Sequence, residues 1–522
     1  MAVSQLPALI VSADFLPGGG VLNGRRWAGQ QLLRAWARLA GSDPLTLLMG
    51  DPGQDSAAFQ SFVREAGHCG CFKALPLSDP RPLAAVGALF LSDTSIGRWA
   101  QWRRPASSAA FSLIGQIHTI STPAAIEQIE DLVSQPLESW DAVFCSSTAG
   151  RNVVTRLMED REDQILGRCV GNRQVLQSRR PQLPVVPLAL PAAEIARSLP
   201  DRQMARQQLG LSSNEAVVLW LGRLSMLTKS DPWPAYRILQ RAAECLQRSI
   251  TLIECGPDDT EAQGEHFSEL RSLCPQVRFV RLGGAQPVSE QVKRTAMSAS
   301  DLALFLVDNL QETFGLAVAE SMAAGLPVVA SDWDGFRDLV RPGVDGFLVP
   351  TRFASTAIHA SVPLAWQQRI GLTEFPAVAG AFAQLVQIDL AAACDAVLTL
   401  LSNPGLRLAM GRAAQRRAIR CFDAEVVGRQ YLDYFAELAQ RRAHAPQAAH
   451  IPQPSPMSLD PIRAFAGYPS SAPLSGFTAE PLQPLVQAGR GFLWGLIQQA
   501  MDQHHWPALQ QDLSNKHGFP QI

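Results

Sequence analysis

The most informative stretch of this chain is DLALFLVDNLQETFGLAVAESMAAGLPVVAS, residues 301–331. It begins with a short apolar run between Asp301 and Asp308, which is typical of a buried parallel strand. A segment rich in small residues follows and ends at Gly325 and Pro327, as expected of a helix. Another apolar run closes the stretch and predicts a second buried strand. The sequence therefore predicts a βαβ unit whose loop lies at the carboxyl ends of the strands, where open α/β sheets bind ligands.

Two carboxylates mark the start of the predicted helix. Glu312 lies in the loop, where helix-terminal N–H groups lack partners, and Glu320 lies two turns further along. This spacing puts the two side chains about 80° apart around a helix axis, so one ligand crossing the helix start could meet both. Taken alone, the pair is better explained as a charge at the helix N-terminus together with a solvated glutamate than as a ligand site.

The neighbouring residues extend the pattern. Residues 312–331, followed by Asp334-Gly335 and by GVDGFLVP at 343–350, resemble the donor-site motif of family 4 retaining glycosyltransferases. The resemblance implies a GT-B fold, in which two Rossmann-like doubly wound α/β domains face each other across a cleft. It also implies that Glu312 holds donor-sugar hydroxyls and Glu320 the nucleotide ribose. Thr313, Phe314 and Gly315 are assigned to donor binding on the same basis.

Composition restricts the class of protein. With 522 residues, 47% of them hydrophobic, the chain can bury more than one core, which favours two domains. A net charge of −2 gives no indication of bulk nucleic-acid binding. The nine cysteines are scattered and fit a reducing cytosol. Only His68-Cys69-Gly70-Cys71 clusters, and it lacks the second ligand pair of a zinc site, so we expect no metal.

The N-terminal sequence lacks the basic and apolar regions of a secretory signal. No apolar run reaches the roughly 18 residues needed to span a bilayer. We therefore expect a cytoplasmic protein.

The first part of the chain alternates strands and helices, which predicts a doubly wound domain. Expected strands are 7–15, 45–49, 88–91, 110–117 and 142–146, and expected helices are 25–40, 56–66, 95–104, 123–134 and 148–159. Gly18, Gly19 and Gly20 follow the first strand; they fit a flexible turn, and by resemblance they face the donor diphosphate and the acceptor. His118 follows the strand 110–117. It could be structural, but its place resembles that of a family histidine near the donor sugar.

The second domain is expected to open with the strand 216–221, followed by Arg223 and Lys229. Two cations beyond a buried strand can clamp a diphosphate, although a solvated loop is the alternative. They resemble the phosphate-binding pair of the family, with one extra residue between them, which leaves the reach of Lys229 open. Gly256 ends another predicted strand, and the resemblance places it near the nucleotide.

Domain limits follow from these patterns. We expect an acceptor domain at 1–195, a nucleotide-sugar domain at 196–425 with an insertion or flexible flap at 352–385, and a helix at 426–443 that crosses back to the first domain. A proline-rich linker and a partly helical tail, with a helix at 482–501, are expected within 444–522. Charged residues at 161–180 suggest a helical insertion.

The resemblance implies transfer of a sugar from a nucleoside-diphosphate sugar to an acceptor hydroxyl with retention, in polysaccharide or glycolipid biosynthesis. No cofactor is implied beyond this donor substrate. An epimerase or phosphorylase of the same fold is one alternative, and a non-catalytic sugar-binding scaffold is another. A scaffold should have lost one of Arg223, Lys229, Glu312 and Glu320, yet all four are present.

We expect the acceptor to be a carbohydrate or a lipid-linked molecule, and two clusters of residues bear on this choice. Arginines mixed with apolar residues occur at Arg25, Arg26, Trp27, Leu32, Leu33, Arg34, Trp36, Arg38 and Leu39, and again at Arg98, Trp99, Trp102, Arg103 and Arg104. One interpretation is core residues with a solvated rim. The other is weak peripheral contact with an anionic membrane face that presents a phosphate-bearing acceptor. The oligomeric state is not indicated.

Overall fold

The computed structural model describes residues 6–10, 24–49, 56–77, 79–169, 171–453, 465 and 467–468. The chain divides into two units, Met1–Pro454 and Ser455–Ile522, and almost all of the second lies outside the described residues. The predicted tail helix at 482–501 lies there too. The glycines Gly18, Gly19 and Gly20 are also outside the described residues.

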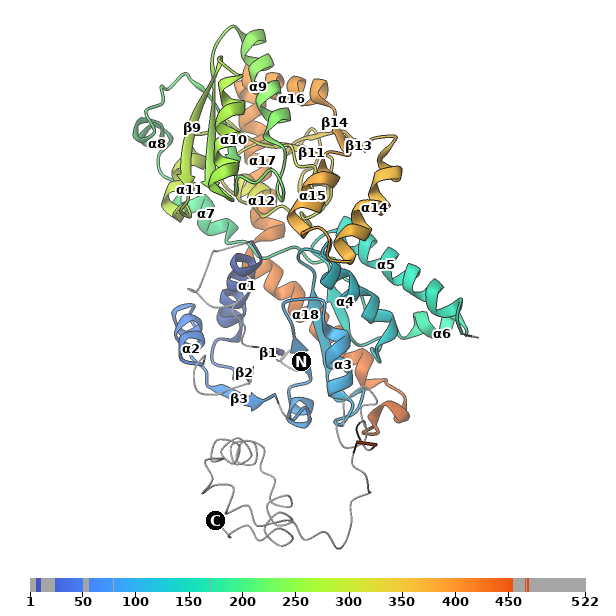
Figure 1. The fold of residues 1–522 in the computed structure, drawn as a ribbon. Coiled ribbons are helices and arrows are strands. Elements are labelled where there is room, and N and C mark those ends of the chain that lie inside the picture. Colours follow the sequence, from blue (N-terminus) through green and yellow to red (C-terminus); the bar gives the residue numbers. More distant parts are fainter. Residues whose placement is uncertain are drawn as a thin grey trace, which may run out of the picture. The chain divides into compact units, whose positions relative to one another are not determined.

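The first domain is built on a six-stranded sheet of order β3-β2-β1-β4-β5-β6, parallel throughout (Figure 1). Its strands are β1 Ala8–Ile10, β2 Leu45–Met49, β3 Phe72–Pro76, β4 Ala88–Phe90, β5 Ser112–Gln116 and β6 Ala142–Phe144. The strand order reverses between β1 and β4, which is the switch point where such sheets bind ligands. β3 was not predicted, because this short edge strand is largely exposed and Lys73 interrupts its apolar residues.

The helices of the first domain match the expected alternation. They are α1 Gly24–Ala40, α2 Ser56–Glu65, α3 Ile96–Arg103, α4 Pro123–Ser134, α5 Thr148–Leu166 and α6 Arg173–Ser178, with a 3-10 turn η1 at Arg81–Ala85. Thr122 and Ser147 cap α4 and α5 by accepting backbone N–H bonds, which explains where these helices begin. The end of α5 and all of α6 fall in the segment expected to be a helical insertion.

The second domain repeats the design, with a parallel sheet of order β12-β11-β10-β7-β8-β9. Its strands are β7 Ala216–Leu221, β8 Ile250–Pro257, β9 Val277–Gly284, β10 Leu302–Phe305, β11 Val328–Ser331 and β12 Gly346–Val349. Its helices are α7 Ala192–Ser198, α8 Arg202–Gln208, α9 Pro232–Leu246, α10 Glu261–Ser272, α11 Glu290–Ala299, α12 Leu316–Ala323 and α13 Phe336–Leu339. The predicted βαβ unit corresponds to β10, α12 and β11.

The domain limit lies close to α7. Ala192 and Ile195 of this helix pack in the core of the second domain, so the expected limit at 195/196 falls inside the helix.

The segment expected to be an insertion or flexible flap is a small ordered subdomain. α14 Ala357–Arg369 and α15 Phe375–Ala383 are enclosed by an antiparallel pair, β13 Thr351–Phe353 and β14 Val386–Ile388. The carbonyl of Leu385 accepts the N–H of Ala354 and closes the base of the subdomain. The segment thus forms its own hydrogen-bonded structure.

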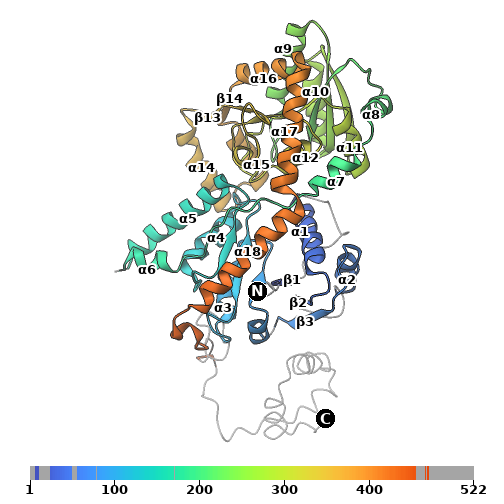
Figure 2. The same ribbon diagram turned by 180° about the vertical axis from the view of Figure 1, so that it is seen from behind.

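The last helices connect the two domains. α16 Leu390–Ser402 and α17 Pro404–Phe422 pack on the second domain, and α18 Ala424–Ala443 packs against α1 of the first (Figure 2). A 3-10 turn, η2 Gln447–His450, follows. Tyr431 and Phe435 of α18 meet the ring of Trp36 at centroid distances of 5.7 and 5.9 Å. α18 thus contributes aromatic residues to the core of the first domain.

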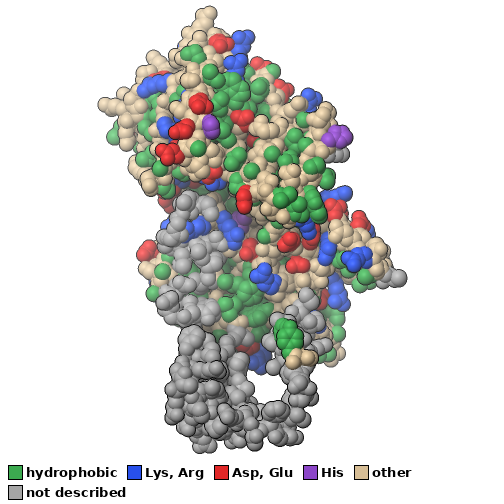
Figure 3. Space-filling model, viewed as in Figure 1, with side chains coloured by type: hydrophobic (Ala, Val, Ile, Leu, Met, Phe, Trp, Pro, Cys, Tyr) green, Lys and Arg blue, Asp and Glu red, His purple; other side chains and the backbone are tan. Residues whose placement is uncertain are grey.

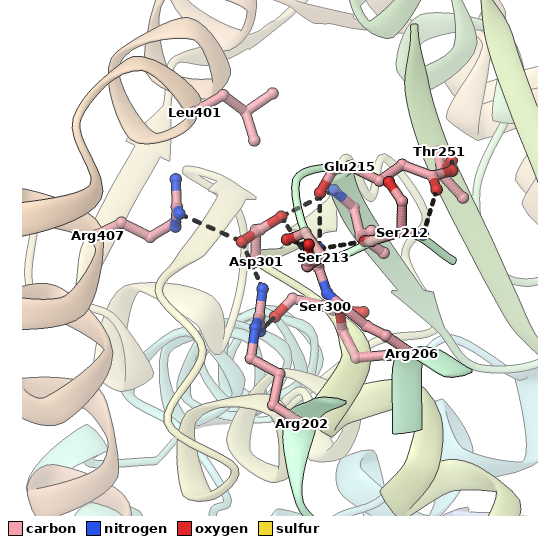
Figure 4. A network of polar contacts seen from close by, with 12 residues as sticks. Arg202, Arg206, Ser212, Ser213, Glu215, Thr251, Ser300, Asp301, Leu401 and Arg407 are labelled. Atoms are coloured by element: carbon pink, nitrogen blue, oxygen red, sulfur yellow. Dashed lines mark hydrogen bonds and ion pairs between the residues drawn. The ribbon is translucent and has the colours of Figure 1, made fainter. Parts of the chain in front are cut away.

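A buried ion network fixes the amino end of β10 (Figure 4). The carboxylate of Asp301 lies 2.7 Å from Arg202, 3.0 Å from Arg206 and 3.3 Å from Arg407, and it accepts the N–H of Val217. It therefore joins α8 and α17 to the sheet. This anchor precedes β10, whereas Glu312 follows it, so Asp301 supports the fold at the opposite edge from the candidate site.

Most side chains of the two clusters rich in arginine and tryptophan, at residues 25–39 and 98–104, belong to the core or to its rim. Leu32, Leu33 and Trp36 are buried in the first domain. Arg103 is not on a rim: it is fully buried and forms a bidentate pair with Asp141 at 2.6 and 2.8 Å. These side chains are unavailable to a membrane surface. Among the described residues, no helix is long and apolar enough to cross a bilayer.

Candidate functional site

Three adjacent strands of the second domain end in glycines that bring their backbones close together. Gly256, near the end of β8, has φ +157°, and a Cβ there would lie 1.9 Å from the carbonyl oxygen of Gly222. Gly283, in β9, has φ +126°, and its Cβ would lie 2.1 Å from the oxygen of Gly256. Glycine is thus required at these positions by backbone packing alone. As a result, backbone atoms without side chains form the carboxyl edge of the sheet next to Arg223.

Arg223 is held by neighbouring polar groups. Its guanidinium lies 2.5 Å from Asp259 and donates to the hydroxyl of Thr228 at 3.0 Å. Ser225 donates to the other oxygen of Asp259 at 2.7 Å. Asp259 thus orients both Arg223 and Ser225 in the loop that follows β7. The side chain of Arg223 remains 35% exposed, so it can contact a ligand.

Lys229 and Glu312 form the central pair of the site. The turn 225–230 is closed by bonds from the N–H groups of Lys229 and Ser230 to the carbonyl of Ser225. It directs the Lys229 ammonium to within 3.3 Å of the Glu312 carboxylate. The extra residue in this loop therefore leaves Lys229 able to reach the loop before α12.

Glu312 is an ionised acceptor in this setting. Its Oε1 accepts the N–H of Gly315 at 3.0 Å and that of Phe314 at 3.4 Å. Burial alone would raise the pKa of Glu312, but Lys229 and these N–H donors outweigh it and hold the pKa below its ordinary value. The carboxylate is therefore charged at neutral pH.

The three residues after Glu312 have different roles. Gly315, at φ +103°, caps α12, and a Cβ there would lie 2.5 Å from Phe336. The side chain of Phe314 is buried against Phe422, so only its backbone can face a ligand. The carbonyl of Thr313 accepts the hydroxyl of Ser146 from the first domain at 3.1 Å. This loop is thus tied to both domains.

Asp334 is a second carboxyl beside Glu312. It has φ +54°, the left-handed conformation of a turn. Burial, together with the negative charge of Glu312, raises its pKa well above the ordinary value. The next residue, Gly335, packs so closely that a Cβ would lie 2.6 Å from the Cα of Phe314. Asp334 is therefore fixed in place against the loop of Glu312.

Glu320 has a cationic partner that sequence reasoning missed. Lys293 of α11 lies 3.5 Å from Glu320 and 2.6 Å from Glu290. The Lys293 ammonium also lies 5.9 Å from the ring centroid of Trp27 in α1. Burial raises the pKa of Glu320, while Lys293 opposes this shift. Lys293 has no motif of its own, but its position in the helix after Gly283 and Gly284 could have indicated it.

His118 lies in the first domain near Arg25 and a serine backbone group. Burial, with the charge of Arg25, lowers its pKa to about 3 despite a hydrogen bond with the backbone of Ser92. His118 is thus neutral at physiological pH and can bind a hydroxyl but not supply a proton. Arg25 itself lies 3.7 Å from Asp93. The sequence left Arg25 either in a solvated rim or at a membrane surface, and the structure places its charge near His118.

A cavity of about 760 Å³ adjoins Glu312 and Asp334. Its walls come from α4 and α5 of the first domain and from the segment 351–382 of the second. Separately, within the part of the chain that the structure describes, no group of three or more histidine, cysteine and acidic side chains could hold a metal ion.

Residues 215–362 match the family described as glycosyl transferases group 1. A D-inositol 3-phosphate glycosyltransferase of Nocardioides sp. is 33% identical over 161 residues, which are 29% of this chain and 34% of that protein. A protein of the same name from Rhodococcus erythropolis is 30% identical over 244 residues, 45% of this chain and 50% of that protein. The chain thus spans between a third and half of the length of these relatives.

Among solved structures, a glycosyltransferase from Rickettsia africae superposes with a TM-score of 0.52 at 12% identity, covering 83% of this chain and 97% of that one. This likeness concerns the fold, and the expected GT-B architecture of two Rossmann-like domains is confirmed. The segment that matches the group 1 glycosyltransferase family contains Arg223, Lys229, Glu312 and Glu320.

Proposed function

We propose that this protein is a retaining glycosyltransferase that moves a sugar from a nucleoside-diphosphate sugar to an acceptor hydroxyl. The observation that carries the proposal is the ion pair of Lys229 with Glu312, 3.3 Å apart at the carboxyl edge of the second sheet. In a nucleotide sugar, the diphosphate and the sugar are joined at the reacting carbon. A cation that binds the diphosphate and a carboxylate that binds the sugar must therefore lie next to each other.

The proposed reaction assigns one task to each group. Lys229 and Arg223 stabilise the charge that grows on the departing diphosphate. Glu312 accepts hydrogen bonds from donor-sugar hydroxyls, and Glu320 accepts them from the ribose. His118, neutral because its pKa is near 3, positions the sugar from the first domain.

Bond making and breaking occur on one face of the sugar. The bond from the anomeric carbon to the diphosphate oxygen breaks as the bond to the acceptor oxygen forms. The acceptor proton passes to the leaving diphosphate, so no enzyme nucleophile is needed. Retention follows because the acceptor enters on the face that the diphosphate leaves.

The biological setting is part of the same proposal. We place the reaction in polysaccharide or glycolipid assembly, on the cytoplasmic side, with a carbohydrate or lipid-linked acceptor. The relatives that bear the name D-inositol 3-phosphate glycosyltransferase support a phosphate-bearing acceptor.

Release of free nucleotide tests the function. The protein is incubated with UDP-, GDP-, ADP- and dTDP-sugars without acceptor, and nucleotide is measured over time. We expect slow hydrolysis of one donor by the wild type and a strong reduction in Lys229→Ala. Arg429→Gln, on the exposed face of α18, serves as a control that leaves the rate unchanged. No release from any donor would contradict the proposal.

A further inference from the structure

The cavity beside Glu312 is lined mainly by apolar side chains from both domains. α5 contributes Val153 and Leu157, and the small subdomain contributes Phe353, Val362 and Trp366. A sugar acceptor alone would be recognised by hydroxyl-binding groups, whereas these five side chains are apolar. The lining instead suits a hydrocarbon chain, because binding it removes apolar surface from water.

The wall formed by α14 is exposed to an unusual degree. Val362 is 70% exposed and Trp366 is 59% exposed. Ile370 and Leu372, just beyond the helix, are also exposed. Figure 3 shows hydrophobic side chains gathered on the surface over α14. Apolar residues scattered singly on a surface need no explanation, but a contiguous group beside a cavity indicates a binding surface.

The aromatic part of the wall is held in position. Trp333 donates its indole N–H to the carbonyl of Asn309 at 3.1 Å. The ring of Phe353 meets that of Trp333 edge-on at 5.7 Å. Because Trp333 immediately precedes Asp334, the same loop presents both an apolar wall and a carboxyl to the cavity.

The charged residues that line the cavity indicate which chemical group is joined to the hydrocarbon chain of the ligand. Three arginines line the cavity, Arg337, Arg352 and Arg369, against the two acidic residues Glu312 and Asp334. Arg337 is also bound to Asp332 at 2.7 Å. Arginine recognises phosphate through paired N–H donors. A rim of this kind complements an anionic headgroup.

We propose that this cavity binds the apolar chain of the acceptor, and that the acceptor is an anionic amphiphile with a phosphate joined to a hydrocarbon chain. This inference rests on the proposed glycosyltransferase function. It assigns the lipid-linked acceptor to α14 and α5, in place of the arginine- and tryptophan-rich residues of α1 and α3, most of which are core or rim.

Binding of three probes to the full chain tests the ligand class. Decyl phosphate carries both features, decyl glucoside carries the chain alone, and ethyl phosphate carries the phosphate alone. Calorimetry below the micellar concentrations should show saturable binding of decyl phosphate, weaker binding of decyl glucoside and the weakest of ethyl phosphate. Decyl phosphate binding no more tightly than ethyl phosphate would overturn the inference.

Matched variants locate the site. Val362→Asn and Trp366→Ala should each weaken decyl phosphate binding about tenfold, since each removes apolar contact with the chain. Val344→Asn changes an exposed valine outside the cavity and should have no effect. Arg369→Gln should remove the preference for phosphate over glucoside, while Arg429→Gln should retain it. Equal losses in Val362→Asn and Val344→Asn would contradict the assigned site.

Nucleotide release separates the two proposals, because no residue of α14 is assigned to the donor. Release that persists in Val362→Asn and Trp366→Ala, with weakened decyl phosphate binding, is the expected result. If the wild type releases nucleotide but does not bind decyl phosphate, the function stands and the acceptor inference fails. The altered side chains are exposed, so melting temperatures should match the wild type.

Discussion

At the scale of single residues, the site pairs each important carboxylate with a cation. Glu312 faces Lys229, and Glu320 faces Lys293. The two pairs differ electrostatically, because the pKa of Glu312 is lowered whereas that of Glu320 is raised. Glu312 has backbone N–H donors in addition to its lysine, but Glu320 lies near the negative Glu290. The same residue type is therefore a stronger acid at position 312 and a weaker acid at position 320.

Kinetics of two variants separate their assigned roles. Lys229→Ala should lower kcat more than donor affinity, because its charge matters most as the diphosphate leaves. About 2–4 kcal/mol of barrier is typical of one such group. Glu320→Ala should instead raise the donor KM, since a ribose contact is similar before and during transfer. Steady-state rates on the preferred donor measure both, and identical kinetic changes in the two variants would contradict the assignment.

The pH dependence of stability tests Asp308. Burial, with the charge of Asp231, raises its pKa from 3.8 to about 7. The folded state therefore binds a proton that the unfolded state has lost, so the contribution of Asp308 to stability is fully present below pH 3.8 and is lost as the pH rises to about 7. Each pKa unit corresponds to about 1.4 kcal/mol.

Asp308→Asn should remove this contribution, because the amide stays neutral at every pH. Chemical denaturation between pH 4 and 8 should show a smaller loss of unfolding free energy in the variant than in the wild type, by a few kcal/mol at most. Asp332→Asn, an exposed carboxylate, controls for the general effect of lost charge. Parallel pH profiles of wild type and Asp308→Asn would show that Asp308 is not the titrating group.

At the scale of elements, the sequence predicted the strands and helices that are marked by runs or repeats of buried apolar residues. It did not predict the features that depend on contacts between particular side chains. β7 lies where the apolar run placed it, and β10 and β11 flank the predicted helix. α12 begins only at Leu316, however, because Gly315 adopts a left-handed conformation and Glu312 binds the N–H groups of the loop. The 80° separation expected for two helical carboxylates thus does not apply, since Glu312 is outside the helix.

Other parts of the site could not be predicted, for a related physical reason. The partnerships of Lys293 with Glu320 and of Asp259 with Arg223 join residues from different βα units. Such contacts depend on how strands are ordered in the sheet, which periodicity does not reveal. The buried pair of Arg103 with Asp141 was mistaken for part of a charged rim for the same reason.

The Asp301 network supplies a test of element packing. Asp301→Asn should lower the unfolding free energy by about 3–5 kcal/mol, because it leaves Arg202, Arg206 and Arg407 without their shared carboxylate. Asp332→Asn breaks an exposed ion pair and should cost less than about 1 kcal/mol. Denaturant titration measures both. Equal effects would mean that the Asp301 network does not anchor β10.

At the scale of the whole molecule, α17 and α18 belong to different domains although they adjoin in sequence. Phe422, at the end of α17, packs in the second domain, while Phe435 of α18 packs with Trp36 in the first. Asp423 caps α18 by accepting the N–H of Glu425, and it also accepts the N–H of Ala193. One residue thus connects the last helices to the start of α7.

Phe435→Ala should destabilise the first domain selectively. Removing a buried phenylalanine costs about 3–5 kcal/mol, so the unfolding transition of the first domain should shift to a lower denaturant concentration. Nucleotide binding should persist, because Arg223, Lys229 and Glu320, which are assigned to the diphosphate and the ribose, lie in the second domain. Leu408→Ala alters an exposed side chain of α17 and is the control. Loss of nucleotide binding in the folded variant would show that α18 shapes the donor site.

Calorimetric titration with nucleotide sugars tests the central claim most directly. UDP-, GDP-, ADP- and dTDP-sugars are titrated into the wild type and into Arg223→Ala. The proposed diphosphate clamp predicts saturable one-to-one binding of at least one donor to the wild type, weakened about tenfold or more in Arg223→Ala because a charge-assisted contact is lost. Failure of all four donors to bind, or equal affinity in the two proteins, would contradict it.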